Sequence, residues 1–174
     1  MNTNNPTPRV KHARTPHLPW SQGVNSDDKV IFSLDRFLGR SVVVTEKMDG
    51  ESTSIYADGL HARSLDSGHH LSRTRVKTLQ AELSHRIPLG WRIVGENMQA
   101  KHSIYYEALP SHFLVFAIFD DKNVALAWDS TVLFAKEYGL NYALVLYLGI
   151  WDEKQIKACL RGGEVSSEEN RKGM

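Results

Sequence analysis

The stretch SVVVTEKMDG, residues 41–50, sets the expected fold, because it carries a strand directly into a turn. Three consecutive valines are typical of a buried β-strand, and Asp49-Gly50 is a turn signal. Lys47 therefore stands at the end of a buried strand, where loss of hydration favours the neutral amine. A neutral amine held in this way can attack a phosphorus or carbonyl centre. Taken alone, the four residues 47–50 fit a surface lysine before a turn better than a nucleophile.

Around this stretch, hairpins alternate with helices. Strands are predicted at residues 29–33, 41–46, 52–57, 60–65, 91–98, 113–119, 124–128 and 143–148. Asp58-Gly59 between two of them predicts a two-residue type I′ hairpin. Helices are predicted from a cap at Ser72 to about residue 86, from residue 129 or 130 to 139, and from 152 to Gly162-Gly163. The pattern predicts an α+β domain with antiparallel sheets and packed helices.

The domain organisation follows from length and composition. The chain has 174 residues, enough for one domain with a real core. Residues 1–28 are rich in Asn, Pro, Thr and Ser and are expected to form an extended N-terminal arm. Residues 29–163 are expected to form the domain, and the polar residues 164–174 a disordered tail.

Charge and cysteine content exclude several classes of protein. Lys and Arg number 21 against 20 Asp and Glu, so a polyanion must bind at a local patch rather than through bulk charge. The single Cys159 excludes an internal disulfide and fits a reducing compartment. No apolar run has the length of a membrane helix, and the N-terminus lacks the apolar run of a signal peptide. We therefore expect a soluble, cytoplasmic protein without a membrane partner.

Two further elements carry candidate chemistry. Gly95-Glu96-Asn97 ends a predicted strand, and a carboxylate there can accept from a ribose hydroxyl, hold a metal ion or pair with an arginine. The strand at residues 113–119 alternates aromatic and aliphatic side chains, which places Phe116 and Ile118 on one face. A ring in that position can stack on a purine, although an aromatic residue in a strand is more often part of the core.

The basic and histidine-rich stretches are less specific. Arg73 and Lys77 share one side of the predicted helix and Arg75 lies away from them, which fits either a solvated helix face or a phosphate track. His61, His69 and His70 have no spacing typical of a metal motif, so no structural metal is expected there.

The order and spacing of these elements resemble a known superfamily. Lys47-x-Asp49-Gly50, a strand ending in Gly95-Glu96, and the aromatic strand with Phe116 resemble motifs I, III and IIIa of the covalent nucleotidyltransferases, which include DNA ligases, RNA ligases and mRNA capping guanylyltransferases. The stretches RTPHLPWS (14–21), HARS (61–64), GEN (95–97) and KHSI (101–104) resemble a bacterial and phage branch of the RNA ligases. The resemblance spans residues 14–152 approximately.

The resemblance implies an ATP-grasp-like ligase adenylation domain and a role for each matching residue. Lys47 is implied to form a lysyl-AMP phosphoramidate with ATP, and the turn at Asp49-Gly50 to aim it. Glu46 and Met48 are implied to line the adenine edge, largely through backbone groups.

The remaining implied contacts concern the nucleotide and the RNA. Arg63 is implied to contact the nucleotide or an RNA phosphate, Glu96 a ribose hydroxyl, and Phe116 the adenine face. The implied cofactors are ATP and Mg²⁺, with the metal ligands unassigned, and the implied partners are RNA 5′-phosphate and 3′-hydroxyl ends.

The sequence also departs from the family pattern. Ala117 stands where many ligases carry an acidic residue, and neither the motif IV strand nor the motif V lysine pair is found before residue 174. Glu164-Val165 is too poor a match to be motif IV. We therefore expect a partial adenylation domain, with three interpretations open: a truncated ligase, half of a split enzyme completed by a separate polypeptide, or a non-catalytic remnant that binds nucleotide or RNA ends. A nucleotidyltransferase with another acceptor is a further alternative.

Overall fold

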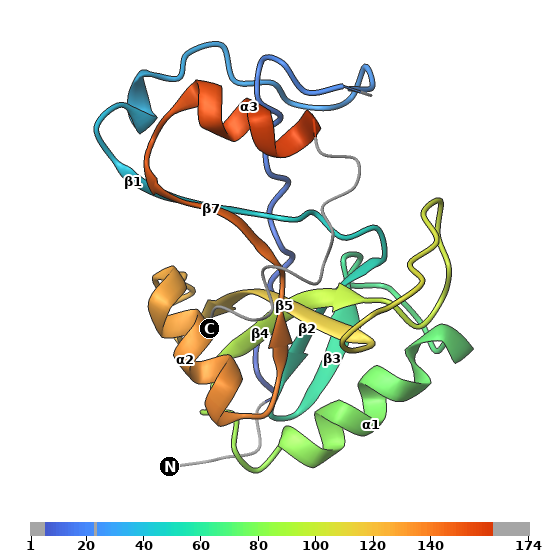
Figure 1. The fold of residues 1–174 in the computed structure, drawn as a ribbon. Coiled ribbons are helices and arrows are strands. Elements are labelled where there is room, and N and C mark those ends of the chain that lie inside the picture. Colours follow the sequence, from blue (N-terminus) through green and yellow to red (C-terminus); the bar gives the residue numbers. More distant parts are fainter. Residues whose placement is uncertain (1–5, 23, 162–174) are drawn as a thin grey trace. The chain divides into compact units, whose positions relative to one another are not determined.

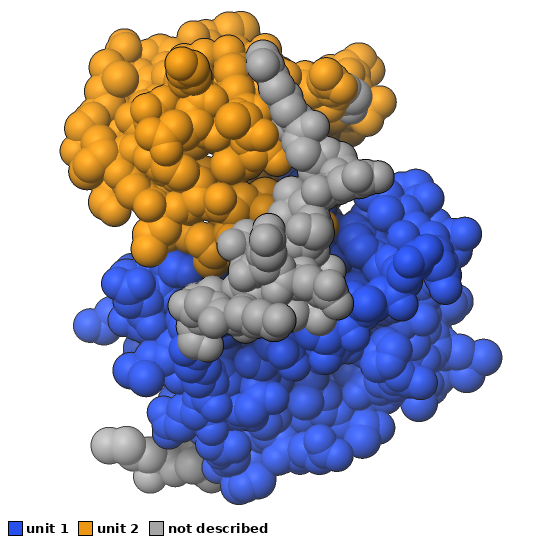
Figure 2. All heavy atoms as spheres, in the orientation of Figure 1, with its two compact units in different colours: residues 1–14, 47–143 blue, residues 15–46, 144–174 orange. Residues whose placement is uncertain are grey.

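A computed structural model describes residues 6–22 and 24–161 of the chain (Figure 1). The described residues form two compact units, shown in different colours in Figure 2. The larger unit comprises residues 6–14 and 47–143, and the smaller unit comprises residues 15–46, apart from Gly23, and 144–161. The chain therefore crosses between the units three times, and one crossing lies between Glu46 and Lys47.

A five-stranded sheet with the order β3-β2-β4-β5-β6 forms the centre of the larger unit. All neighbouring strands in it are antiparallel except the parallel pair β5 and β6. The strands are β2 (Glu51–Tyr56), β3 (Gly59–Ala62), β4 (Arg92–Asn97), β5 (Phe113–Phe119) and β6 (Asn141–Tyr142).

Two helices cover one face of this sheet (Figure 1). Helix α1 (Thr74–Leu83) follows the short 3-10 helix η2 (Leu71–Arg73), and α2 (Trp128–Glu137) precedes β6. Helix α1 faces the sheet with Val76 and Leu83, which lie seven residues apart and therefore on one side of the helix. The core of the unit combines these side chains with Ile55, Ile93, Val115, Ile118 and Ala135.

The N-terminal arm is bonded to the edge hairpin of the sheet. The backbone N–H of Thr7 and the guanidinium of Arg9 donate to the carboxylate of Asp58 at 2.7 and 2.8 Å. The N–H of Val10 donates to the hydroxyl of Tyr56 at 3.0 Å. These bonds anchor residues 7–10, so this part of the arm belongs to the folded body.

A bulge in β5 changes the expected alternation. Val94 pairs with Ala117 and Gly95 with Val115, which leaves Phe116 without a partner in β4. Val115 and Ile118 consequently both reach the helix-covered core, although they are three residues apart. The prediction that Phe116 and Ile118 share a face is therefore wrong.

The smaller unit is built on a two-stranded antiparallel sheet of β1 (Ser41–Thr45) and β7 (Val145–Ile150). Helix α3 (Glu153–Arg161) follows β7, and a short 3-10 helix η1 (Asp35–Phe37) precedes β1. The Trp151 ring stacks on Phe37 with ring centres 4.6 Å apart. This aromatic contact links the segment before β1 to the segment after β7.

The expected fold class is confirmed, since the structure is α+β with mainly antiparallel sheets. Four further local predictions are wrong. Residues 29–33 and 124–128 form no strand and contribute only isolated bridges at Val30 and Ala125. In the hairpin, Tyr56 pairs directly with Gly59, so Ala57-Asp58 forms the loop. The backbone N–H of Ser72 donates to His70, so His70 rather than Ser72 begins the helical segment.

At the C-terminal end, helix α3 is confirmed, while Gly162-Gly163 and the predicted tail 164–174 lie outside the described residues. No helix in the described part of the chain has the length and apolar character needed to cross a membrane.

Gly95 gives the first testable prediction, because a side chain has no room at this position. A Cβ there would lie 2.5 Å from the Phe113 ring and 2.8 Å from the carbonyl oxygen of Leu114. We expect Gly95→Ala to lower the free energy of unfolding by about 1–3 kcal/mol, as overpacking of a core does. Gly68→Ala is the matched control, since no atom lies within 4 Å of a Cβ at that position. Denaturant unfolding that gives equal stabilities for the two variants would contradict this account of Gly95.

Candidate functional site

Lys47 is the first residue of the second segment of the larger unit and follows the end of β1 by two residues. Its side chain is exposed, so the prediction that a buried strand end strips its hydration is wrong for this structure. The physical reason is that β1 ends at Thr45, so Lys47 lies beyond the strand rather than at its last position. Glu46 is half-buried, and its backbone N–H donates to Leu144 within the smaller unit at 2.8 Å.

The turn after Lys47 is fixed by hydrogen bonds to the end of β4 and to the loop that follows. The N–H of Gly50 donates to the Oε1 of Glu96 at 3.1 Å. The N–H of Asp49 donates to the hydroxyl of Tyr106 at 2.9 Å. Gly50 also approaches β4 so closely that a Cβ would lie 2.6 Å from the carbonyl oxygen of Asn97. The expected Asp49-Gly50 turn therefore exists, and only glycine fits its second position.

The carboxylate of Asp49 closes the same turn from the other side. Its Oδ2 accepts from the N–H and hydroxyl of Ser103 at 2.8 and 2.6 Å and from the N–H of Ile104 at 2.9 Å. The hydroxyl bond from Ser103, with the backbone bonds from Ile104 and Ser103, lowers the pKa of Asp49. The KHSI stretch thus has a structural role, which is to hold the turn that carries Lys47.

The carboxylate of Glu96 interacts electrostatically with Lys47. Burial raises the pKa of Glu96, while the Gly50 hydrogen bond and the positive charges of Lys47 and His102 oppose the rise. The side chain is half-buried, and among the described residues the bond from Gly50 is the one hydrogen bond recorded for its carboxylate. Glu96 therefore keeps acceptor capacity for another group. This hydrogen bond brings together Gly50 and Glu96, which lie 46 positions apart in the sequence.

Met48 is buried, unlike its neighbours Lys47 and Asp49. Its side chain is 8% exposed and packs with Met98 and Leu114, next to the partly buried Tyr106 and Leu109. This small apolar cluster fixes the backbone between Lys47 and Asp49. The side chain of Met48 thus belongs to the core, which is compatible with the expectation that it meets a nucleotide through backbone groups.

Phe116 and Arg63 lie near a residue that the sequence did not single out. The ring of His12 contacts Phe116 edge-on at 5.3 Å between ring centres. Burial, followed by the charges of Arg92 and Arg63, lowers the pKa of His12. Arg63 is exposed and follows the end of β3 directly. The arm thus reaches the aromatic strand, a contact between residues over a hundred positions apart that no local pattern in the sequence indicates.

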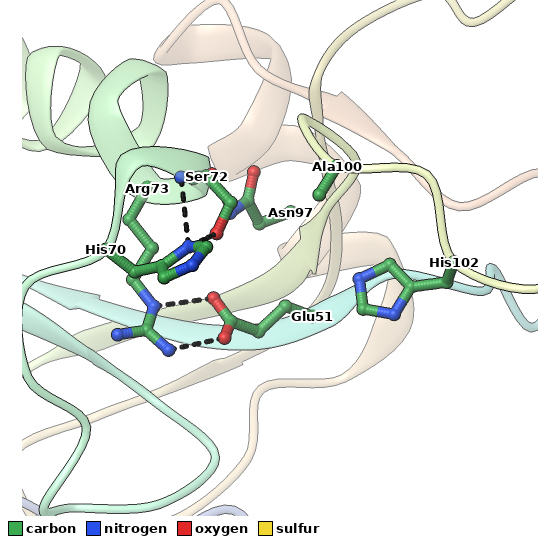
Figure 3. A pocket seen from close by; sticks show the side chains of 7 residues that line it. All are labelled: Glu51, His70, Ser72, Arg73, Asn97, Ala100 and His102. Carbon is green, nitrogen blue, oxygen red and sulfur yellow. Dashed lines mark hydrogen bonds and ion pairs between the residues drawn. The ribbon is translucent and has the colours of Figure 1, made fainter.

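A polar pocket of about 260 Å³ opens beside the start of β2 (Figure 3). Glu51 and Arg73 form its base as a two-bond ion pair, with Nε–Oε2 and Nη2–Oε1 distances of 2.7 and 2.5 Å. The Arg73 hydrogen bond is the main reason that the pKa of Glu51 is lowered. The lining residues are Glu51, His70, Ser72, Arg73, Asn97, Ala100 and His102.

The pocket includes Arg73, the first residue of the basic run. Arg73 donates to Glu51 and, through Nη1, to the carbonyl of Gly68, so it is not free to follow a phosphate backbone. Arg75 contacts the ring of His112 and is exposed. Sequence reasoning missed the pocket, because Glu51 and Arg73 lie 22 positions apart. Within the described residues, no group of three His, Cys, Asp or Glu side chains could hold a metal ion.

Comparison with known proteins places the chain in context. The family model described as RNA ligase matches residues 40–174. No curated protein matches the sequence. Among solved structures, a Naegleria gruberi RNA ligase with PPi is 18% identical with a TM-score of 0.49, and the match covers 87% of this chain and 52% of that one.

Two mutant forms of the same ligase are similar to a comparable degree. An apo form is 17% identical over 70% of this chain and 40% of that chain, with a TM-score of 0.49. A form with ATP and Mn is 19% identical over 71% of this chain and 41% of that chain, with a TM-score of 0.48. The chain thus spans about half or less of the length of these ligases.

The raised pKa of Glu96 predicts a stabilising substitution. A carboxyl whose pKa is raised by folding contributes stability below its unfolded pKa, and this contribution is lost as the pH rises through the folded pKa. Glu96→Gln removes the buried charge and keeps an oxygen that can accept from Gly50. We expect it to raise the melting temperature by on the order of 2 °C at neutral pH, with the gain shrinking toward pH 4. A melting temperature that falls at neutral pH would show that the Glu96 carboxylate stabilises the fold.

Proposed function

Because the chain belongs to the RNA ligase family, we propose that it is the nucleotide-binding part of an ATP-dependent RNA ligase in which Lys47 carries AMP. The observation that supports this most directly is the bonding of the Lys47 turn to Glu96 and to Ser103. These bonds fix the backbone on both sides of the proposed nucleophile. Such preorganisation is what positions a reacting atom for in-line attack.

The proposed reaction has three steps. The Nζ of Lys47 attacks the α-phosphorus of ATP, a P–N bond forms, the bond to the β-phosphate oxygen breaks, and pyrophosphate leaves as the amine loses a proton. An oxygen of an RNA 5′-phosphate then displaces Lys47 from the phosphorus. Finally an RNA 3′-hydroxyl attacks the activated 5′-phosphate and releases AMP. The RNA 5′-phosphate and 3′-hydroxyl ends are thus the proposed partners.

The exposure of Lys47 has a consequence for the first step. Lys47 is exposed in this structure, so its loss of water is proposed to accompany nucleotide binding. Glu96 is proposed to accept from a ribose hydroxyl, since its carboxylate has acceptor capacity and lies within electrostatic reach of Lys47. Phe116 is proposed to stack on the adenine and Arg63 to meet a phosphate.

Glu46 and Met48 complete the proposed nucleotide contacts through their backbone groups. A divalent metal ion, Mg²⁺ in our proposal, would neutralise phosphate charge during transfer. Mg²⁺ usually keeps several waters and binds one or two carboxylates together with substrate phosphates. The half-buried carboxylate of Glu96 fits such a partial site.

Covalent labelling tests the nucleophile. We expect incubation with α-labelled ATP and Mg²⁺ to give an acid-labile labelled protein, and Lys47→Ala to abolish the label. The matched control is Lys122→Ala, another exposed lysine in a loop, which should label as the unaltered chain does. Label that persists in Lys47→Ala would refute the assignment of the nucleophile. Preference for GTP over ATP would indicate a capping-type enzyme.

A second variant separates base stacking from core packing. We expect Phe116→Ala to weaken ATP binding by about 1–3 kcal/mol, the usual cost of losing a stacked base. The control is Phe113→Ala, whose ring is 3% exposed and belongs to the core, and which should instead lose about 3–5 kcal/mol of stability. Thermal melting and ATP titration of both variants measure the two effects. A large fall in melting temperature with unchanged ATP affinity would assign Phe116 to the core.

A further inference from the structure

The loop after β4 exposes an unusual combination of side chains. Tyr105 is 69% exposed and Ile104 51% exposed. The Nζ of Lys101 lies 5.5 Å from the centre of the Tyr105 ring. Of the aromatic side chains in the described part of the chain, Tyr105 and Phe32 alone are exposed. An exposed ring beside a flexible cation is the combination with which proteins bind single-stranded nucleic acid.

The inner side of the same loop holds the turn of Lys47. Ser103 and Ile104 donate to Asp49, and Tyr106 accepts from the Asp49 N–H. Lys101 and Tyr105 therefore point outward from a segment whose intervening residues fix the proposed nucleophile. A ligand that binds the outer side of this loop therefore lies next to the segment that is bonded to Asp49, two residues after the proposed nucleophile.

The polar pocket adjoins this loop, which contributes Ala100 and His102 to its wall (Figure 3). Its one arginine, Arg73, is already bonded to Glu51. Because Glu51 and Arg73 neutralise each other, this lining offers a phosphate no unpaired guanidinium.

The Ser72 hydroxyl is bonded to His70, and the Asn97 amide is bonded to Ser72 and Gln99. The exposed imidazole of His102 is therefore the group that this lining offers to a sugar hydroxyl. A ribose fits this lining better than a phosphate does.

We propose that Lys101, Tyr105 and the polar pocket form a docking surface for a single-stranded RNA end. Tyr105 stacks on a base, Lys101 meets a backbone phosphate, and the pocket takes a ribose. The inference rests on the proposed function and deepens it, because it places the RNA end beside the turn that carries Lys47. A pocket that binds the 2′-hydroxyl also distinguishes RNA from DNA.

Binding of single-stranded RNA tests the proposed docking surface. A fluorescent single-stranded RNA with a 5′-phosphate is titrated with the unaltered chain and with the double variant Lys101→Ala, Tyr105→Ala. We expect the double variant to bind about tenfold to a hundredfold more weakly. The matched control is Lys122→Ala with Phe32→Ala, which removes one exposed lysine and one exposed aromatic ring elsewhere. Equal affinity of the double variant and the control would overturn the proposal, as would the absence of RNA binding by the unaltered chain.

A DNA strand of the same sequence tests the pocket. We expect the unaltered chain to prefer RNA, and His102→Ala to reduce that preference by about two- to tenfold, the worth of one hydrogen bond. Equal binding of RNA and DNA by the unaltered chain would overturn the ribose assignment. Labelling with ATP is measured on the same samples. RNA binding that depends on Tyr105 without any label at Lys47 would support the surface and refute the proposed function, so the two failures are distinguishable.

Discussion

The close approach between Gly50 and the end of β4 is the constraint on which the candidate site depends. The Gly50 N–H donates to Glu96, and the absence of a side chain lets the turn lie against the backbone of Asn97. Without this contact, Lys47 would leave β1 on an unsupported loop. With it, the direction of the lysine is set by the most buried strand pair of the sheet, β2 and β4.

The same constraint explains why a partly buried carboxylate is tolerated. Glu96 loses hydration, and a single hydrogen bond from Gly50 does not restore its ordinary pKa. Asp49 precedes the glycine that donates to Glu96 and has the opposite environment, since three donors from Ser103 and Ile104 stabilise its charge. The two carboxylates therefore divide their roles: Asp49 is saturated and structural, while Glu96 retains capacity for another partner.

How much the sequence predicts depends on the range of the interaction. The bounds of β5 and the valine strand β1 follow from local composition, because β-branched and aromatic side chains mark them. The turn at Asp49-Gly50 follows from its residue types, whereas its contact with Glu96 is a tertiary contact. The Glu51–Arg73 pair, the Asp49–Ser103 bonds and the His12–Phe116 contact are set by tertiary packing, which no local pattern specifies. The Asp58-Gly59 turn is misplaced by one residue because Gly59 takes a paired strand position opposite Tyr56.

The pairing of β1 with β7 has a consequence for how the chain folds during synthesis. Ser41 pairs with Ile150, so β1 is synthesised more than a hundred residues before the strand with which it pairs. At typical elongation rates of about 5–20 residues per second, this strand stays unpaired on the ribosome for roughly 5–20 s. An unpaired, valine-rich edge is a template for association with other chains. Slow translation, or a deletion that removes β7, is therefore expected to lead to aggregation through residues 41–45 even when the larger unit has already folded.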